Sequence, residues 1–173
     1  MIEKAREFAL KMHGDQDHGC LKIGAHLEDV ATHVAKHYDD KVNLAPKDDI
    51  VAAAWLHDVL EDTEAQFEQI EDSFGLFTAN IVWLVTDQVG KNRVDRHLKT
   101  YHYIRADLDA TLVKLCDRRH NQERSIKHGE HWMAMYKSEY LYFKFALWQP
   151  NQFVALWDEL DSQFEEMNRR LTW

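Results

Sequence analysis

Apolar residues recur at three- and four-residue spacing along most of the 173-residue chain and seldom alternate with polar ones. This period is that of an amphipathic helix, whereas strict alternation would indicate strands. Two prolines and six glycines interrupt the pattern only rarely. The sequence therefore predicts an all-α protein in which each helix buries one apolar stripe.

The pattern places these helices along the whole chain. The first two are expected over residues 2–12 and 27–38, and a short helix near residues 67–74 ends at a glycine. Further helices are expected over residues 81–85, 94–104 and 112–116, and two amphipathic helices around Pro150 close the chain. The polar stretch from 87 to 92 is the clearest break, so we expect a loop there.

One segment, residues 50–56, is apolar on nearly every side. Pro46 followed by Asp48 resembles a helix start, with a proline and a cap in the first turn. A helix that is apolar all round belongs at the centre of a bundle. We therefore expect a single-domain helical bundle over residues 1–173, with a motif-bearing core over about 1–125 and C-terminal helices over about 130–173.

Net charge and composition limit the kinds of partner and the cellular location that are expected. A net charge of −9 would repel nucleic acid and anionic membranes, so we expect no nucleic acid and no membrane as partner. The chain has no run of about eighteen apolar residues, and its charged N-terminus lacks a signal-peptide pattern, so a cytoplasmic protein is expected. Cys20 and Cys116 have no metal-type spacing and are expected to be free thiols.

Eleven histidines raise the expectation of a metal site, because imidazole is the commonest metal ligand in proteins. Most of these histidines fall among polar neighbours, and we expect them on the solvated surface. This group consists of His13, His18, His33, His37, His97, His102, His128 and His131.

The central apolar helix ends in four ionisable residues, His57, Asp58, Glu61 and Asp62. Their spacing predicts that all four project toward one side of the same helix. Carboxylates that converge beside an imidazole repel one another unless a cation lies among them or a proton is shared. We therefore expect a metal here, although a His-Asp pair alone is weak evidence, since chance supplies about one in such a chain.

Two further residues complete this pattern. Asp117 stands where the apolar segment 112–116 turns polar, and His26 stands at the start of the second predicted helix. For Asp117 a role as salt-bridge partner of Arg118 or Arg119 is the less favoured alternative, whereas His26 alone would be interpreted as an ordinary helix-start residue. Their combination with the His-Asp pair favours one shared metal site.

These residues resemble the metal-binding set of the HD superfamily of phosphohydrolases. The likeness extends in order through residues 53–63, 74–75, 81–86 and 114–121 to the hydrolase domain of RelA/SpoT-type alarmone enzymes and to small alarmone hydrolases. The Glu-Asp-Thr run that begins at Glu61 is its most discriminating part. The resemblance implies an HD-domain bundle that removes pyrophosphate from the 3′ position of guanosine tetra- and pentaphosphate (ppGpp), the nucleotides of the stringent response.

The resemblance also implies roles for individual residues. Glu61 and Asp62 would be catalytic, orienting the attacking water and carrying protons, and Asn121 would contact the nucleotide. Mixed nitrogen and oxygen ligands suit manganese or a similar divalent ion, although spacing alone cannot name the metal. The implied ligands of a manganese ion are His26, His57, Asp58 and Asp117.

Two segments depart from the alarmone pattern. Alarmone hydrolases carry an arginine, which packs against the guanine base, and then Gly-x-Pro-Tyr before the first metal histidine, whereas residues 19–25 contain no arginine, proline or tyrosine. Lys22 is the nearby cation and is expected to meet substrate phosphate as a point charge. Arg124 follows Asn121 at a shifted position and is expected to contact substrate as well.

The activity stays open between three interpretations. The Glu-Asp-Thr run favours ppGpp hydrolysis, whereas the missing arginine favours a nucleotidase or nucleoside phosphate hydrolase of the wider superfamily. A nucleotide-binding module without turnover is disfavoured, because every metal position and both proton-transfer carboxylates are present. Each interpretation has a phosphorylated nucleotide as ligand. Aromatic residues between 132 and 157 are expected mostly in the core, and exposed members could form a homodimer surface.

Overall fold

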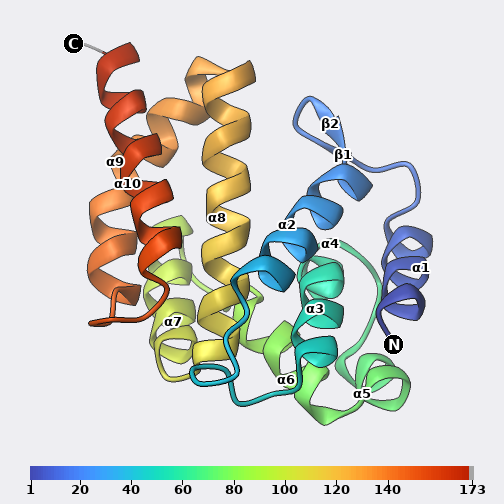
Figure 1. Ribbon diagram of the computed structural model, residues 1–173. Coiled ribbons are helices and arrows are strands. Elements are labelled where there is room, and N and C mark those ends of the chain that lie inside the picture. Colours follow the sequence, from blue (N-terminus) through green and yellow to red (C-terminus); the bar gives the residue numbers. More distant parts are fainter. Residues whose placement is uncertain (172–173) are drawn as a thin grey trace.

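The computed structural model describes residues 1–171. Their regular structure is helical apart from one antiparallel hairpin, so the predicted all-α fold class is confirmed (Figure 1). None of these helices is long and apolar enough to cross a membrane. The elements are α1 (Ile2–His13), β1 (Asp17–His18), β2 (Leu21–Lys22), α2 (Ile23–His37), α3 (Lys47–Leu56), α4 (Val59–Asp62), α5 (Phe67–Phe74), α6 (Leu76–Val85), α7 (Arg93–Arg105), α8 (Leu108–His128), α9 (Glu130–Leu147) and α10 (Val154–Arg170).

The central buried helix predicted from the sequence is α3. Its residues 50–56 are all buried, and it packs against α1, α2, α6 and α8. Pro46 lies at the N-cap rather than inside the first turn, which instead contains Asp48 and Asp49. Acidic side chains there interact favourably with the positive end of the helix dipole, so the apolar stretch has a polar, well-defined beginning.

The long helix α8 joins two groups of helices. It packs against α2, α3 and α6 on one side and against α7, α9 and α10 on the other (Figure 1). Its first half is apolar, but its second half stays buried while turning polar. The buried polar side chains are Asp117, Arg118, Arg119, His120, Asn121, Gln122, Arg124 and Ser125. Buried groups of this kind need hydrogen bonds, opposite charges or a ligand.

The prediction that one helix carries all four ionisable residues from His57 to Asp62 was wrong. α3 ends at Leu56 with His57 as its C-cap, and Asp58, at φ −93° and ψ −6°, is the N-cap of α4. This backbone lies between helical and turn geometry, so the chain bends at the His-Asp pair. The Asp58 carbonyl still accepts from the amide of Asp62 at 2.9 Å, which keeps Glu61 and Asp62 beside the bend.

A short hairpin that the sequence pattern did not predict leads into α2. Asp17 pairs with Lys22 and His18 with Leu21, and Gly19 lies in the turn at φ +66°. This left-handed backbone favours glycine, because a Cβ atom there clashes with the following carbonyl. Two-residue strands show no alternation, so periodicity could not reveal them.

Five of the histidines expected on the surface are buried or partly buried. His13 and His97 are buried, His18 is partly buried beside the predicted metal ligands, and His33 and His37 are partly buried as well. The expectation rested on polar sequence neighbours, but the packing of α1, α2, α7 and the hairpin turns these side chains inward. Local polarity was therefore a poor guide to their burial.

Candidate metal centre

The four predicted ligands converge at one point. His26 comes from α2, Asp117 from α8, and the His57–Asp58 pair from the bend between α3 and α4. His26 Nε2 lies 3.1 Å from His57 Nε2, 3.4 Å from Asp58 Oδ2 and 3.5 Å from Asp117 Oδ1. His57 Nε2 lies 3.2 Å from Asp58 Oδ1. Elements far apart in sequence thus bring four donors within reach of a single ion.

The donor set fits a divalent cation. His57 Nδ1 donates to the carbonyl of Ala54 at 2.7 Å, so a neutral His57 presents the bare lone pair of Nε2 to the cluster. That nitrogen faces His26 Nε2 and two carboxylates, and only a shared proton or a cation makes this arrangement favourable. His26, His57 and Asp117 each offer a ligand atom within 4.8 Å of the others. Two imidazoles and two carboxylates are ordinary ligands for such an ion.

The protonation states also suit metal binding. Burial lowers the pKa of His26 to about 4, so its imidazole is neutral at physiological pH. Burial would raise the pKa of Asp117, but Lys114 and the two imidazoles together lower it to about 2. The pKa of Asp58 is likewise lowered against its burial, chiefly by His57 and His26. Neutral imidazoles and ionised carboxylates are the forms that bind metals.

A cavity of about 170 Å³ opens at this cluster. Its lining includes the acidic residues Asp58, Asp117, Glu61 and Asp62 and also a set of basic residues. The cavity therefore combines a place for a cation with a place for anionic groups. The basic and aromatic lining residues are His18, Arg93, His97, Tyr101, Lys114, Arg118, Tyr136 and Phe143.

Both predicted catalytic carboxylates lie at this cavity. Glu61 and Asp62 reach solvent, yet enough protein surrounds them that desolvation raises the pKa of each. The repulsion of Asp58 adds to this rise for Asp62. Glu61 Oε2 accepts from the backbone amide of Asp87 at 3.2 Å, which fixes its carboxylate beside the cluster. A raised pKa makes a carboxylate better able to carry a proton near neutral pH.

Comparison with known proteins gives relatives that are mostly named as pyrophosphohydrolases, together with a GTP pyrophosphokinase of Brucella ovis that is 29% identical over 153 residues, 79% of this chain and 19% of that protein. No protein-family model matches the chain. The guanosine-3′,5′-bis(diphosphate) 3′-pyrophosphohydrolase MESH1 of Danio rerio is 35% identical over 94 residues, 53% of this chain and 52% of that protein. The Spiroplasma citri guanosine-3′,5′-bis(diphosphate) 3′-pyrophosphohydrolase is 34% identical over 127 residues, 69% of this chain and 16% of that protein. The chain thus spans about half the length of the MESH1 protein it matches.

A solved structure of a related hydrolase also matches this chain. It is the structure of a metazoan ortholog of SpoT that hydrolyzes ppGpp, and it aligns over 99% of this chain and 95% of its own at a TM-score of 0.70. At 22% identity this match shows the shared fold. The chain is a relative of the RelA/SpoT-type hydrolases. The resemblance inferred from the sequence is confirmed, together with the HD-type helical fold.

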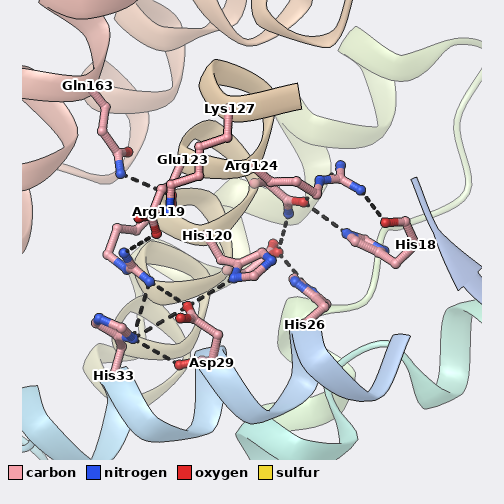
Figure 2. Close-up of polar contacts among 12 residues, drawn as sticks. His18, His26, Asp29, His33, Arg119, His120, Glu123, Arg124, Lys127 and Gln163 are labelled. Atoms are coloured by element: carbon pink, nitrogen blue, oxygen red, sulfur yellow. Dashed lines mark hydrogen bonds and ion pairs between the residues drawn. The ribbon is translucent and has the colours of Figure 1, made fainter. Parts of the chain in front are cut away.

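The predicted substrate contacts of this RelA/SpoT relative are only partly brought together. Asn121 lines the cavity, and its amide nitrogen donates to Asp117 Oδ1. Lys22 is exposed on the hairpin and pairs with Asp17 Oδ1 at 2.7 Å. Arg124 is buried beneath the hairpin and donates to the carbonyl of His18 at 2.6 Å (Figure 2). Neither of these two cations is among the residues that line the cavity.

Sequence reasoning missed the basic wall of the cavity. Lys114 Nζ lies 3.1 Å from Asp117 Oδ2, and Arg93 and Arg118 are both held by Glu139, at 2.6 and 3.0 Å. Lys114 could have been found from its position three residues before a ligand on the same helix. The two arginines are brought together only by the packing of α7, α8 and α9.

His18 is the other residue that sequence reasoning missed. Its ring stacks on that of His26, with centroids 4.0 Å apart and planes at 12°, and burial lowers its pKa. On the far side of His26, the ring of His120 lies 4.8 Å away, and Asp29 takes up an ion pair with His120 Nδ1 at 3.0 Å (Figure 2). Arg119 donates to the same Asp29 carboxylate. The first predicted ligand is therefore enclosed by imidazoles on two sides.

Proposed function

We propose that this chain is a metal-dependent phosphohydrolase that removes the 3′-pyrophosphate of guanosine tetra- or pentaphosphate. The observation that carries the proposal is the cavity in which a converging His/Asp cluster, two carboxylates of raised pKa and a basic wall meet. The names of the relatives give the substrate, since MESH1 of Danio rerio is a guanosine-3′,5′-bis(diphosphate) 3′-pyrophosphohydrolase.

The cofactor in this proposal is manganese, held by His26, His57, Asp58 and Asp117. Two imidazole nitrogens and two carboxylates suit this ion and leave coordination positions for other ligands. When bound, such an ion lowers the pKa of water and polarises a phosphoryl oxygen. The fixed tautomer of His57 and the ionised state of Asp117 prepare the site for it.

Proton transfer belongs to Glu61 and Asp62. Glu61 is fixed by the amide of Asp87 and lies one helical turn beyond Asp58, where it can orient an attacking water. Asp62 lies on the same side and its pKa is raised, so it can give a proton to the leaving oxygen. General acid–base assistance of this kind contributes about 10²- to 10⁴-fold to rate.

The basic wall binds the phosphates. Lys114 and Arg93 bring positive charge to the lining of the cavity, and Arg118, which also lines it, is fixed by Glu139. Positive groups that are already in place stabilise the charge that develops on a phosphoryl group without reorganising. In this proposal these residues replace the phosphate contact that the sequence assigned to Lys22.

One observation favours the nucleotidase alternative. Residues 19–25, where alarmone hydrolases carry their arginine and Pro-Tyr, form the hairpin turn, β2 and the start of α2. No arginine of this segment is available to pack against a guanine base.

Two other expectations stay predictions, namely a cytoplasmic location and a homodimer formed through exposed aromatics such as Phe145 and Trp148.

Product analysis tests the proposal. Purified protein is incubated with manganese and with ppGpp, its adenosine analogue, or ordinary nucleoside mono-, di- and triphosphates. We expect pyrophosphate from the 3′-pyrophosphorylated nucleotides, with loss of turnover in Asp58→Asn and Glu61→Gln and unchanged turnover in the surface control Asp15→Asn. Orthophosphate from an ordinary nucleotide would establish the nucleotidase alternative. Metal binding without any turnover would establish a binding module.

A further inference from the structure

The hairpin before α2 is built to hold one side chain, that of His18. Arg124 Nη1 donates to the His18 carbonyl at 2.6 Å, and Arg124 Nη2 lies 3.4 Å from Asn121 Oδ1. Gly19 allows the hairpin backbone to approach Arg124 this closely, because a Cβ atom on residue 19 would lie 2.2 Å from Arg124 Nη1. The backbone of His18 is therefore fixed to α8 at the cavity (Figure 2).

A chain of hydrogen bonds leads from His18 to a metal ligand. The Asn121 amide nitrogen donates to Asp117 Oδ1, since an ionised carboxylate only accepts. This orientation leaves Asn121 Oδ1 facing His18 Nε2 at 2.9 Å. Because an amide oxygen also only accepts, His18 must carry its proton on Nε2 and donate it to Asn121. The order of donation is then His18 to Asn121 to Asp117.

This chain fixes the carboxylate of Asp117. Its Oδ1 accepts from Asn121 and faces His26 Nε2 at 3.5 Å, while Oδ2 lies 3.1 Å from Lys114 Nζ. Both oxygens are thus held before any ion arrives. Partners that orient a metal ligand in this way commonly change metal affinity by about 10- to 100-fold when they are removed.

His18 itself is poorly placed to be a ligand. One of its nitrogens lies within 4.8 Å of donor atoms of His26 and Asp58, which by distance alone would allow coordination. However, imidazole lone pairs lie in the ring plane, and the planes of His18 and His26 are stacked at 4.0 Å and 12°. An ion about 2 Å from His26 Nε2 in the His26 plane would lie well off the His18 plane.

We propose that His18 is a positioning residue of the metal centre, which orients Asp117 through Asn121 and packs against the ring of His26. The hairpin and Arg124 serve to place it. The proposal concerns metal binding in the absence of substrate, so it can fail or hold independently of the pyrophosphohydrolase assignment.

The test is manganese affinity of the metal-free full chain, measured by calorimetry and by the EPR signal of free manganese. We expect His18→Ala to weaken binding about 10- to 100-fold. His18→Gln, whose amide can donate to Asn121, should recover most of the affinity. Lys22→Ala changes the same hairpin outside the cavity and should bind as the wild type does. Thermal melting shows that each variant is folded.

Two further measurements separate positioning from ligation. Gly19→Ala keeps the imidazole but forces the hairpin off Arg124, and it should weaken manganese binding in the same direction as His18→Ala. Pulsed EPR of bound manganese should count two imidazole nitrogens in both the wild type and His18→Ala. Wild-type affinity in folded His18→Ala, or three imidazoles in the wild type and two in His18→Ala, would overturn the proposal.

Discussion

The buried polar half of α8 meets two different environments. Toward the cavity, Asp117 joins Asp58 and two imidazoles, so that lone pairs and like charges converge. Toward α9, Arg118 donates to Glu139 at 3.0 Å and to the carbonyl of Tyr136, and its guanidinium lies 4.6 Å from the Tyr136 ring centroid. In the first set Lys114 and Asn121 partner Asp117, but Asp58 and the two imidazole nitrogens still converge on one another, whereas the second set is fully paired.

We infer from this difference that the side of α8 facing α9 contributes mainly to stability and the side facing the cavity mainly to function. A buried charge that is paired and hydrogen-bonded stabilises the fold. Removing one partner leaves the other charge buried and uncompensated, which is strongly destabilising. A cluster in which acceptors outnumber donors costs stability, and its retention in a fold points to a ligand. The two environments on one helix should therefore respond to opposite kinds of perturbation.

The largest effect is expected from neutralising the cavity side. Asp58→Asn removes a proposed ligand, so kcat/KM should fall at least about 10³-fold, or about 4 kcal/mol of transition-state stabilisation. The metal-free free energy of unfolding should fall by less than about 1 kcal/mol, because a like-charge contact is also removed. Steady-state kinetics and urea unfolding measure both quantities. Normal turnover in this variant would remove Asp58 from the ligand set.

The paired side should show the reverse behaviour. Glu139→Gln leaves the buried Arg118 without its counter-charge, so the free energy of unfolding should fall by about 3 kcal/mol. The manganese dissociation constant should stay within about twofold, since no proposed ligand or its support is touched. Glu165→Gln, on the exposed face of α10, is the matched control for charge. A tenfold weaker metal affinity with unchanged stability would contradict the division.

Metal removal tests the cavity side without a mutation. Manganese at about 100 times its dissociation constant should stabilise the folded chain by about 2.7 kcal/mol. For a chain of this size that corresponds to a rise in Tm of roughly 5–10 °C, which a chelator should abolish. Glu139→Gln should start from a lower Tm but gain the same increment, whereas Asp58→Asn should gain none. Differential scanning fluorimetry with and without chelator measures this.

The smallest expected effect is on acid sensitivity. Burial would raise the pKa of Asp29, but the hydrogen bond from His120 and the charge of Arg119 lower it overall. A carboxyl whose folded-state pKa is depressed contributes stability that is present above its unfolded pKa of about 3.9 and is lost as pH falls below that value. The Tm difference between wild type and Asp29→Asn should therefore be largest near pH 7 and shrink by pH 3. A difference that grows on acidification would reverse the sign.

The fold could be predicted, and a candidate ligand set proposed, because each rests on a long or combined signal. The apolar run of α3 and the helical period elsewhere extend over many residues, and four ligands in a fixed order rarely occur together by chance. The bend at Asp58 could not be predicted, because no proline or glycine occurs between residues 47 and 74. It depends instead on tertiary packing.

The residues that surround the proposed ligands could not be predicted from the sequence either. His18 has only polar sequence neighbours, and its strand is two residues long, so neither composition nor period marks it. Lys22 and Arg124 were expected at the substrate, but one turns toward Asp17 and the other is used to seat the hairpin. Contacts between α8 and the hairpin join residues about a hundred positions apart, which local reasoning does not reach.

The bend and α8 together have a consequence for synthesis on the ribosome. His26, His57 and Asp58 emerge early, but Asp117 lies some sixty residues later, in the middle of α8. A nascent chain therefore presents an incomplete set of the proposed ligands until the middle of α8 has left the exit tunnel. In the proposed metal centre, capture of an ion then waits until α8 packs against α2 and α3.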